Sequence, residues 1–575
     1  MNHPQTAREP VLVGLVAVAF ALAFSYPVLG HLSEAGFRRD WDLLRQLDWA
    51  AFHSVTHFHQ LPLWNPYKCG GMPLLANPHS RIVTPFFLLH LFLGPNVGLN
   101  LEVPLHLAIA WSGGYVLGRI LGLGPRAAAL SASVFPGSSW FYLHMAVGQV
   151  VYLPSLYLPW IAALTWLAIV RERLFFAGLA GALVALTLGE GGVYPAPQAL
   201  LLVTLVALTV AISRRSFWPV VILLALGGFA LGLAAIKLLP MEMLLRSHPR
   251  PVRIVESNPP GALWTALFSA QQAAFARGPG RWGFHEWGAY VGGLAGGLAV
   301  LGVVTSPRRA LPWLVASLVF LSLVLGQNLG PWSPWSLLHH LPIFSSERVT
   351  PRFLIPCTLT LGVAAAIGVE WLERRLGRVG TIVATVLVGA VVVDLWAVGP
   401  AELRPMVEGR ERSLSFSPTF RQSGDITAFL HMLPLSKANM GAVRCYEYVD
   451  FPSPVIGADQ PGYRGEEYLV GRGSIRQLEW TPNALTYQVE VATPTVLVVN
   501  QNYDPGWRLA DGGGEVVSEN GLLAVRVPAG ASRVKLVFRG RPFAIGVLVT
   551  GLTLVTLLTL WWVEQRRAGG HLRVK

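Results

Sequence analysis

Residues 37–59 read FRRDWDLLRQLDWAAFHSVTHFH and follow the first long apolar segment of the chain, at 11–31. Two carboxylates, Asp40 and Asp42, lie near the start of this polar stretch. The apolar segment on one side and the amphipathic, tryptophan-containing sequence on the other predict that the stretch lies at a membrane surface. We therefore interpret the rest of the chain as a scaffold that holds residues 37–59 in place.

The composition of the chain is that of a membrane protein. Of its 575 residues, 53% are hydrophobic and only 13% are charged, and a water-soluble protein with this balance would aggregate. The formal net charge of +13 comes from short basic clusters between apolar segments, a pattern typical of cytoplasmic loops rather than of a nucleic-acid-binding surface. The sequence thus predicts a polytopic α-helical membrane protein with no nucleic-acid partner.

Apolar segments long enough to cross the hydrocarbon core recur along the chain. We predict about twelve spans of roughly 17–25 residues, at 11–31, 99–121, 127–145, 150–170, 174–189, 194–213, 217–240, 288–306, 310–326, 352–372, 379–399 and 541–563. The run within 77–98 is too short to cross and predicts a re-entrant or interfacial helix.

Arginine clusters orient these spans, because positive charge gathers in cytoplasmic loops. The clusters fall in every second connection: Arg8, Arg119 with Arg126, Arg171 with Arg173, Arg214 with Arg215, Arg308 with Arg309, Arg374 with Arg375, and Arg566 with Arg567. Both termini are therefore predicted to be cytoplasmic. The outward connections are then 32–98, 190–193, 241–287, 327–351 and 400–540.

Residues 400–540 differ in composition from the apolar part of the chain. Alternating apolar and polar residues at 485–492, 495–501, 521–530 and 532–540 predict strands. Turn residues at 504–506 and 511–514 separate them, so we expect a small antiparallel β-sandwich outside the membrane. The predicted organisation is a transmembrane domain at 1–399, this β-rich domain at 400–540, and a last span with a basic cytoplasmic tail at 541–575.

Several motifs, taken in order, resemble the YfhO family of bacterial membrane proteins, which is similar to glycosyltransferases of the GT-C class. The motifs are LPLWNPYKCGGMPL (61–74), LLPMEMLLRSHPR (238–250), HEWGAYVGGLAGGLAVLGV (285–303), LPIFSSERVTPRF (341–353) and YDPGWRLADGGG (503–514). The resemblance implies a GT-C-like fold in the bacterial cytoplasmic membrane. It also implies transfer of a sugar from a polyprenyl-phosphate donor to a cell-envelope polymer, lipid or protein acceptor on the outer face.

Asp40 and Asp42 are the candidate catalytic residues. A sugar that leaves with a lipid phosphate needs little acid assistance, so one carboxylate acting as base on the acceptor hydroxyl is enough. In GT-C enzymes an acidic residue of the first outer loop carries catalysis, and the resemblance assigns that role to Asp40. Asp42 is then a supporting residue or a ligand of a divalent metal. Whether the protein uses such a metal as a cofactor is left open. The alternative is that both aspartates are solvated charges or helix caps.

Other polar residues of the predicted outer face are candidate substrate contacts. For sugar hydroxyls they are Glu190, His144, His285 and Glu286, and for the lipid phosphate they are Lys237, Arg348 and Arg352. The alternatives are a loop charge facing water for Glu190, a favourable helix N-terminus for Glu286, and phospholipid headgroups for the cations. His53 and His57 are spaced i,i+4, but no third ligand is evident, so we predict interfacial histidines rather than a metal site.

Two non-catalytic functions compete with glycosyl transfer. A transporter or flippase of lipid-linked saccharide would need the same lipid-phosphate contacts, but the predicted spans carry few acidic residues or lysines away from their ends. An envelope assembly scaffold would use the β domain. Cys69 and Cys445 fall on the same predicted outer side, so a bridge between them is an open alternative.

Overall fold

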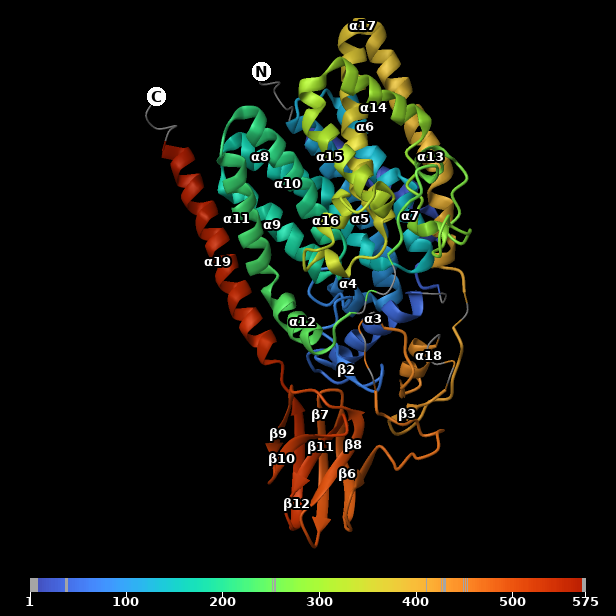
Figure 1. Ribbon diagram of the computed structural model, residues 1–575, viewed down its shortest axis with the longest axis vertical. Helices are drawn as coiled ribbons and strands as arrows, with labels where there is room; N and C mark the ends of the chain where they lie inside the picture. Colours follow the sequence, from blue (N-terminus) through green and yellow to red (C-terminus); the bar gives the residue numbers. More distant parts are fainter. Residues whose placement is uncertain are drawn as a thin grey trace.

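The computed structural model describes residues 9–36, 40–250, 252, 255–409, 411–425, 427, 431–447, 449, 451 and 453–570. A bundle of helices forms one end of the molecule and a β-sandwich forms the other (Figure 1). Arg8, residues 37–39 of the polar stretch and residues 571–575 of the predicted tail lie outside the described residues.

Every predicted apolar segment coincides with a helix or a pair of helices. The helices are α1 (Glu9–Phe24), α2 (Tyr26–Leu29), α5 (Pro95–Ile120), α6 (Pro125–Gly137), α7 (Ser139–Val147), η1 (Val150–Tyr157), α8 (Leu158–Arg171), α9 (Leu174–Gly189), α10 (Pro195–Arg214), α11 (Trp218–Leu233), α12 (Ala235–Ser247), α14 (Gly293–Thr305), α15 (Pro307–Leu325), α17 (Leu354–Val398) and α19 (Arg541–Gly570). The short run within 77–98 forms α4 (Phe87–Leu93).

The predicted count of about twelve spans is not confirmed. By length and apolar composition, the described residues hold 5 helices able to cross a membrane, or up to 6 if α11 and α12, bent by 75° at their junction, form one broken span. Short helices and breaks both contribute to the difference, since α1, α9 and α14 have only 10–17 residues. The segment at 127–145 is divided between α6 and α7, and α17 joins two predicted spans through a kink at Gly377, where φ is 57°.

The predicted outer connections contact one another in pairs. Glu256 of the third connection forms a parallel bridge with Val349 of the fourth, and Lys68 of the first forms one with Ala442 of the last. The Cys69–Cys445 disulfide joins the same two connections, with its Cα atoms 5.2 Å apart. The bridge that the sequence left open is therefore present.

The arginine-rich connections meet one another as well. Arg309 donates to the carbonyl of Leu121 at 3.0 Å, Arg126 pairs with Glu373 at 2.8 Å, and Arg173 pairs with Glu564 at 2.9 Å. The start of α1 and the end of α19 both lie at the end of the bundle that points away from the sandwich (Figure 1). These two ends of the chain therefore lie on the same side of the bundle, while the alternating topology and the membrane side that each end faces stay predictions.

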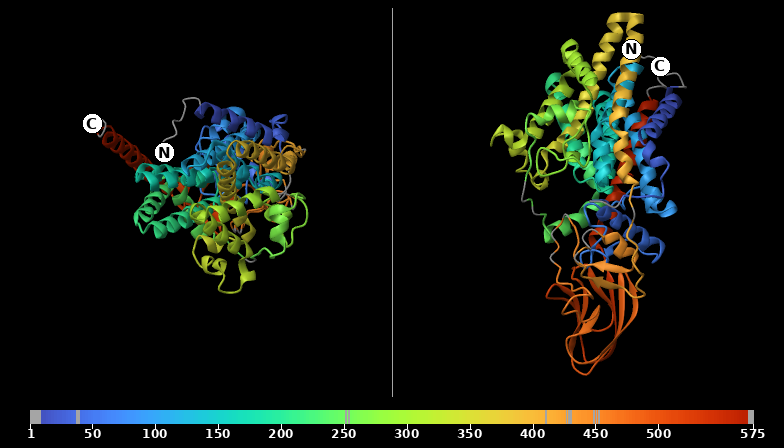
Figure 2. Two further views of the ribbon diagram at one scale, coloured as in Figure 1. Left: turned by 90° about the horizontal axis from the view of Figure 1, so that it is seen from above. Right: turned by 90° about the vertical axis from the view of Figure 1, so that its right-hand side faces the viewer.

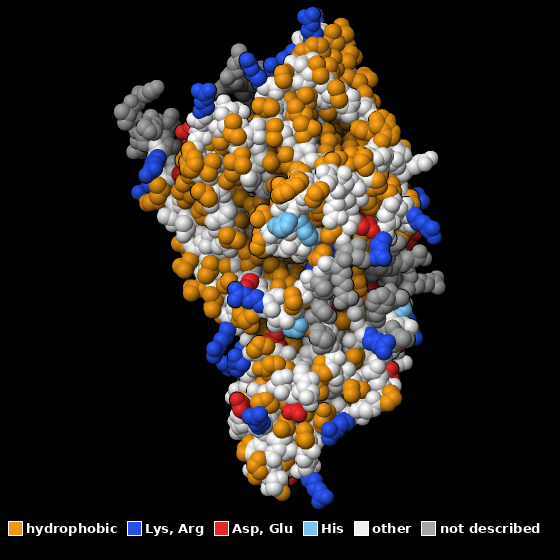
Figure 3. All heavy atoms as spheres, in the orientation of Figure 1, with side chains coloured by type: hydrophobic (Ala, Val, Ile, Leu, Met, Phe, Trp, Pro, Cys, Tyr) orange, Lys and Arg blue, Asp and Glu red, His pale blue; other side chains and the backbone are white. Residues whose placement is uncertain are grey.

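The surface of the bundle is apolar around its middle. Figure 3 shows hydrophobic side chains spread over the helices, with lysine and arginine at the end away from the sandwich, around the sandwich, and at the right-hand edge of the view. On α19, Leu548, Leu552 and Val555 are each at least 60% exposed. Such a surface is stable only against lipid or another apolar surface.

The β-sandwich is formed by Glu467–Phe538, a shorter stretch than the predicted 400–540. Its two antiparallel sheets have the strand orders β10-β11-β8-β5 and β6-β7-β12-β9. The strands are β5 (Glu467–Leu469), β6 (Ser474–Thr481), β7 (Ala484–Val491), β8 (Thr495–Asn502), β9 (Trp507–Asp511), β10 (Glu515–Glu519), β11 (Leu522–Val527) and β12 (Gly530–Phe538). All four predicted strands are confirmed, and side chains of both sheets share one core.

A layer of short elements separates the bundle from the sandwich (Figures 1 and 2). It contains α3 (Asp40–Thr56), the two-stranded sheet of β1 (Trp64–Asn65) and β2 (Met72–Pro73), and α18 (Met432–Lys437). Trp64 of this layer inserts into the sandwich core, with its ring centroid 5.5 Å from that of Trp507 and its indole N–H 2.9 Å from Gln501 Oε1. The polar stretch is therefore enclosed between the two large units.

The disulfide gives a direct test of the fold and of its sidedness. Protein alkylated in intact cells and then denatured without reductant should show one reactive thiol, Cys357, and three after reduction, because Cys69 and Cys445 are bonded and disulfides persist in oxidising compartments. A Cys445→Ala variant should show two thiols without reductant. Three thiols in unreduced wild-type protein would contradict the pairing.

Candidate functional site

Asp40 begins α3 and is half-buried at the side of the helical bundle. Its neighbour Trp41 is buried and donates its indole N–H to the carbonyl of Ala146 at 3.3 Å. The backbone of Trp41 also lies against Gly148, where φ is 94° and a Cβ atom would collide with the Trp41 nitrogen. Only glycine fits this position, so Asp40 lies beside the turn between α7 and η1.

Asp42 has a different environment from Asp40. Its carboxylate accepts the backbone N–H groups of Met432 and Leu433 at 2.8 and 3.0 Å, at the first residues of α18. Burial raises the pKa of Asp42 even though these two hydrogen bonds act in the opposite direction. Asp42 thus ties α3 to α18 as a cap supplied from a distant part of the chain.

A buried ion pair joins the third outer connection to the residue that follows the fourth. Glu286, in η2 (Phe284–Glu286), accepts two hydrogen bonds from the guanidinium of Arg352, at 2.7 and 2.6 Å. Gln149, in the turn next to Asp40, donates to the same carboxylate at 3.1 Å. Burial acts to raise the pKa of Glu286, but the charge and hydrogen bonds of Arg352 outweigh burial and hold that pKa well below its ordinary value.

Histidines and tyrosines surround this ion pair. His144 and His285 lie 3.8 and 3.7 Å from the Glu286 carboxylate. The Arg352 guanidinium carbon lies 5.3 Å from the ring centroid of Tyr152 and 4.8 Å from that of Tyr194, distances at which a cation is attracted to an aromatic face. We call Gln149, His144, His285, Glu286 and Arg352 the central cluster.

The remaining cations differ in their partners. The ammonium of Lys237 donates to four oxygens of the first outer loop, on Leu75, Asn77 and Ser80, at 2.6–3.1 Å. An ammonium has only three protons, so protein oxygens satisfy Lys237 and it fastens the loop. Arg348 instead is half-buried, with its guanidinium carbon 4.7 Å from the centroid of the Trp282 ring.

Glu190 is fully buried rather than a loop charge facing water. Its carboxylate accepts from Tyr157 at 2.5 Å and from Thr84 at 3.0 Å, and it lies 3.0 Å from Nε2 of His106. His106 belongs to a chain of buried polar groups that extends from Glu190 to α3. The chain's members are Asp48, Arg81, His90, Glu102, His106 and Glu190, which we call the buried relay.

His53 and His57 stack on each other along α3, with ring centroids 4.7 Å apart. Burial, followed by the neighbouring His57, lowers the pKa of His53 to about 4. Among the described residues, no group of three His, Cys, Asp or Glu side chains is arranged to hold a metal ion.

A pocket of about 340 Å³ opens along α3 on the side of α18. Arg45, Trp49 and Phe52 line it from α3, and Asn96 and Lys437 line it from neighbouring segments. Arg45 donates to Asn96 at 2.6 Å. An aromatic ring with hydrogen-bonding groups around it is a surface suited to a saccharide.

The structure brings only part of the predicted set together. His144, His285, Glu286 and Arg352 form the central cluster, and Asp40 lies beside its Gln149, whereas Asp42, Glu190 and Lys237 belong to other networks. The sequence analysis missed the members of the buried relay other than Glu190. Glu102 carried a usable signal, because an ionisable residue inside a predicted span is seldom without a function.

Comparisons with known proteins give distant structural likenesses only. No family model and no curated protein matches the chain, so the resemblance to the YfhO family stays a prediction. One similar solved structure is the arabinofuranosyltransferase AftD from Mycobacteria, at 16% identity and a TM-score of 0.45, covering 71% of this chain and 28% of that one. A mutant of AftD is similar at 14% identity and a TM-score of 0.48, covering 79% of this chain and 34% of that one.

The apo oligosaccharyltransferase of Archaeoglobus fulgidus is similar at 12% identity and a TM-score of 0.45, over 76% of this chain and 65% of that one. The chain thus spans less than two thirds of each of these proteins. At such scores the likenesses do not assign the chain to a family.

Proposed function

We propose that this chain is a membrane glycosyltransferase of the GT-C type, which moves a sugar from a polyprenyl-phosphate donor to a cell-envelope acceptor. The order of the motifs, the apolar helical bundle and the joined outer connections support the proposal. The single observation that carries it is the position of Asp40, a half-buried carboxylate at the start of a helix, beside the turn that supplies Gln149 to the Glu286–Arg352 pair. The reaction would take place at the outer face of a bacterial cytoplasmic membrane.

Asp40 acts as the general base in this proposal. Its carboxylate takes the proton of the acceptor hydroxyl while the hydroxyl oxygen attacks the anomeric carbon of the sugar. The bond from that carbon to the phosphate oxygen breaks with inversion, and polyprenyl phosphate leaves with both electrons of the bond. The donor phosphate carries its charge without a proton from an acid, so one carboxylate is sufficient.

Two arginines, one in the fourth outer connection and one directly after it, serve the phosphate. Arg348, which is half-buried, makes the direct contact, and Arg352 supplies a fixed positive charge behind it. Because Glu286 occupies two donors of Arg352, Arg352 is a positioning residue. His144 and His285 are assigned to sugar hydroxyls, whereas Asp42, Lys237 and Glu190 support the loops that carry these groups.

The acceptor is assigned to the pocket along α3. Trp49 offers a ring for stacking against a saccharide, and Arg45 and Lys437 offer hydrogen-bond donors. The pocket and Asp40 lie on the same helix, α3, so the acceptor chain would extend along this helix from the pocket to the base. Tryptophan at this position also fits a polymeric acceptor that enters from the side of the sandwich.

A transporter or flippase of lipid-linked saccharide is the second candidate, because one observation favours it. The buried relay links Asp48 on α3 to Glu190 at the end of α9 through side chains of both charges, except that His106 contacts Glu102 at its backbone carbonyl. Buried ionisable chains of this kind mark ion or proton pathways in transporters. The sequence analysis had counted against a transporter, because the predicted spans carry few acidic residues or lysines away from their ends.

The Asp40→Asn variant tests the base. We expect it to reduce release of polyprenyl phosphate by about 10²–10⁴-fold, with donor binding retained, because the amide keeps the shape of aspartate but is not basic. The measurement uses full-length protein in liposomes with polyprenyl-phosphate sugars labelled in the prenyl chain. Glu34→Gln, an exposed acidic residue of the same loop, is the matched control and should leave the rate unchanged.

Activity of Asp40→Asn within about twofold of wild type would remove this residue from catalysis, since a base contributes far more. Movement of intact labelled donor across the liposome, with no release of polyprenyl phosphate by wild type, would favour the transporter instead.

The Arg352→Lys variant tests the phosphate site. Lysine keeps the charge but cannot reproduce the two-pronged contact with Glu286, so we expect the apparent donor constant to rise while the acceptor constant stays the same. Arg246→Lys, an exposed arginine paired with Glu242 one turn away, is the control. If Arg352→Lys and Arg246→Lys have the same apparent donor constant, the lipid phosphate is bound elsewhere. Arg352→Ala is less informative, because it would leave Glu286 buried without a partner.

A further inference from the structure

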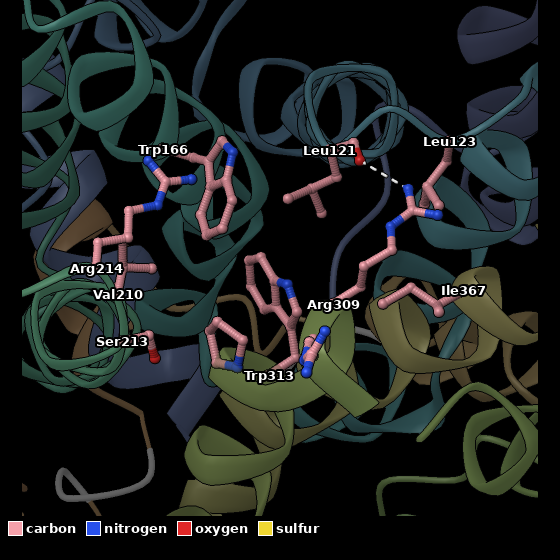
Figure 4. Close-up of a pocket in the computed structure, with 11 residues that line it drawn as sticks. Leu121, Leu123, Trp166, Val210, Ser213, Arg214, Arg309, Trp313 and Ile367 are labelled. Atoms are coloured by element: carbon pink, nitrogen blue, oxygen red, sulfur yellow. Dashed lines mark hydrogen bonds between the residues drawn. The ribbon is translucent and has the colours of Figure 1, made fainter. Parts of the chain in front are cut away.

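A pocket of about 230 Å³ lies at the end of the bundle opposite the sandwich, remote from Asp40. Figure 4 shows Arg214 and Arg309 approaching it from opposite sides, with the rings of Trp166 and Trp313 between them. The walls come from α8, α10, α15, α17 and the connection between α5 and α6. Neither the proposed glycosyl transfer nor the predicted outer site uses these residues.

The pocket has an unbalanced positive charge. Arg214, Arg308 and Arg309 line it, and no lining residue is acidic. Within the described part of the chain, neither Arg214 nor Arg308 forms an ion pair, whereas Arg309 donates to the carbonyl of Leu121 at 3.0 Å. Arg214 and Arg308 are exposed at the mouth, so their donors can reach an anion that enters.

A buried donor also lines the pocket. Trp313 is only 1% exposed, and its indole N–H has no hydrogen-bond acceptor among the described residues. Leaving a buried donor unpaired is unfavourable. The ring of Trp166 lies 6.1 Å away, centroid to centroid, and forms the adjoining wall.

The lining also contains a hydrocarbon surface. Val210 and Pro312 lie near the end of α10 and the start of α15, and the half-buried Leu121 and Trp166 extend the apolar lining beside them. In a membrane protein the ends of the helices lie at the headgroup region of the bilayer. Tryptophan is enriched at that level. A free inorganic anion would satisfy the guanidiniums but would leave this apolar surface without a partner.

We propose that this pocket binds the phosphodiester headgroup of an anionic phospholipid in the membrane leaflet opposite the sandwich. The phosphate lies between Arg214 and Arg308, with Arg309 as a third cation. An ester or glycerol oxygen of the lipid accepts the indole N–H of Trp313, and the first methylene groups of an acyl chain cover Val210 and Pro312. Arginine pockets between helices recognise anionic headgroups in this way.

The test compares two matched variants of the full-length protein in neutral detergent. Binding of dioctanoyl phosphatidylglycerol is measured by native mass spectrometry for wild type, for Arg214→Gln with Arg308→Gln, and for Arg215→Gln. Arg215 adjoins Arg214 and is exposed, but it does not line the pocket. We expect the dissociation constant to rise about tenfold or more in the double variant, which corresponds to about 1.4 kcal/mol, and to stay unchanged in Arg215→Gln.

A second variant and two further ligands sharpen the result. Trp313→Phe keeps the buried ring and removes only the donor, so it should weaken binding severalfold without lowering the melting temperature. Dioctanoyl phosphatidylcholine should bind more weakly than phosphatidylglycerol, and inorganic phosphate should not displace the lipid. Equal binding by the double variant and Arg215→Gln would overturn the site. Displacement by inorganic phosphate at the concentration of the lipid would overturn the lipid as its ligand.

Discussion

The ion pair between Glu286 and Arg352 is the interaction on which the arrangement of the outer connections depends. Both side chains are less than 10% exposed, and removal of one partner from such a pair costs about 3–5 kcal/mol because the other charge stays buried. The pair joins η2 to the start of α17, and Gln149 extends it to the turn against which Trp41 lies. The buried charges of Glu286 and Arg352 therefore help to position Asp40, through Gln149 and the turn that contacts Trp41.

The loop that carries Asp40 is held from several directions. Lys237 binds its carbonyl groups, Lys68 pairs with Glu447 at 2.6 Å, and the disulfide at Cys69 reaches the segment before the sandwich. Asp42 ties α3 to α18. A base that must meet a hydroxyl and an anomeric carbon in one geometry needs such support. The polar residues that do not touch the proposed substrates thus have a function in keeping Asp40 in place.

The sequence predicted the local elements better than the contacts between them. The periodicity of 485–540 correctly located four strands, and every apolar segment became helical, because both signals are local. The span count was not confirmed, since hydropathy does not detect a break such as that between α6 and α7. The partner of Asp42 lies near Met432, and no pattern within α3 predicts so distant a contact. The burial of Glu190 was not predicted, because its partners Thr84, His106 and Tyr157 come from three other segments.

The central claim is that the sugar is transferred at Asp40, between the bundle and the sandwich. A cryo-electron microscopy structure of the protein in nanodiscs with a non-hydrolysable phosphonate analogue of a polyprenyl-phosphate sugar tests it most directly. The account predicts density for the sugar within hydrogen-bonding distance of the Asp40 carboxylate and density for the phosphonate at Arg348. Density for the headgroup along the buried relay, with Asp40 and Arg348 free of contact, would contradict it.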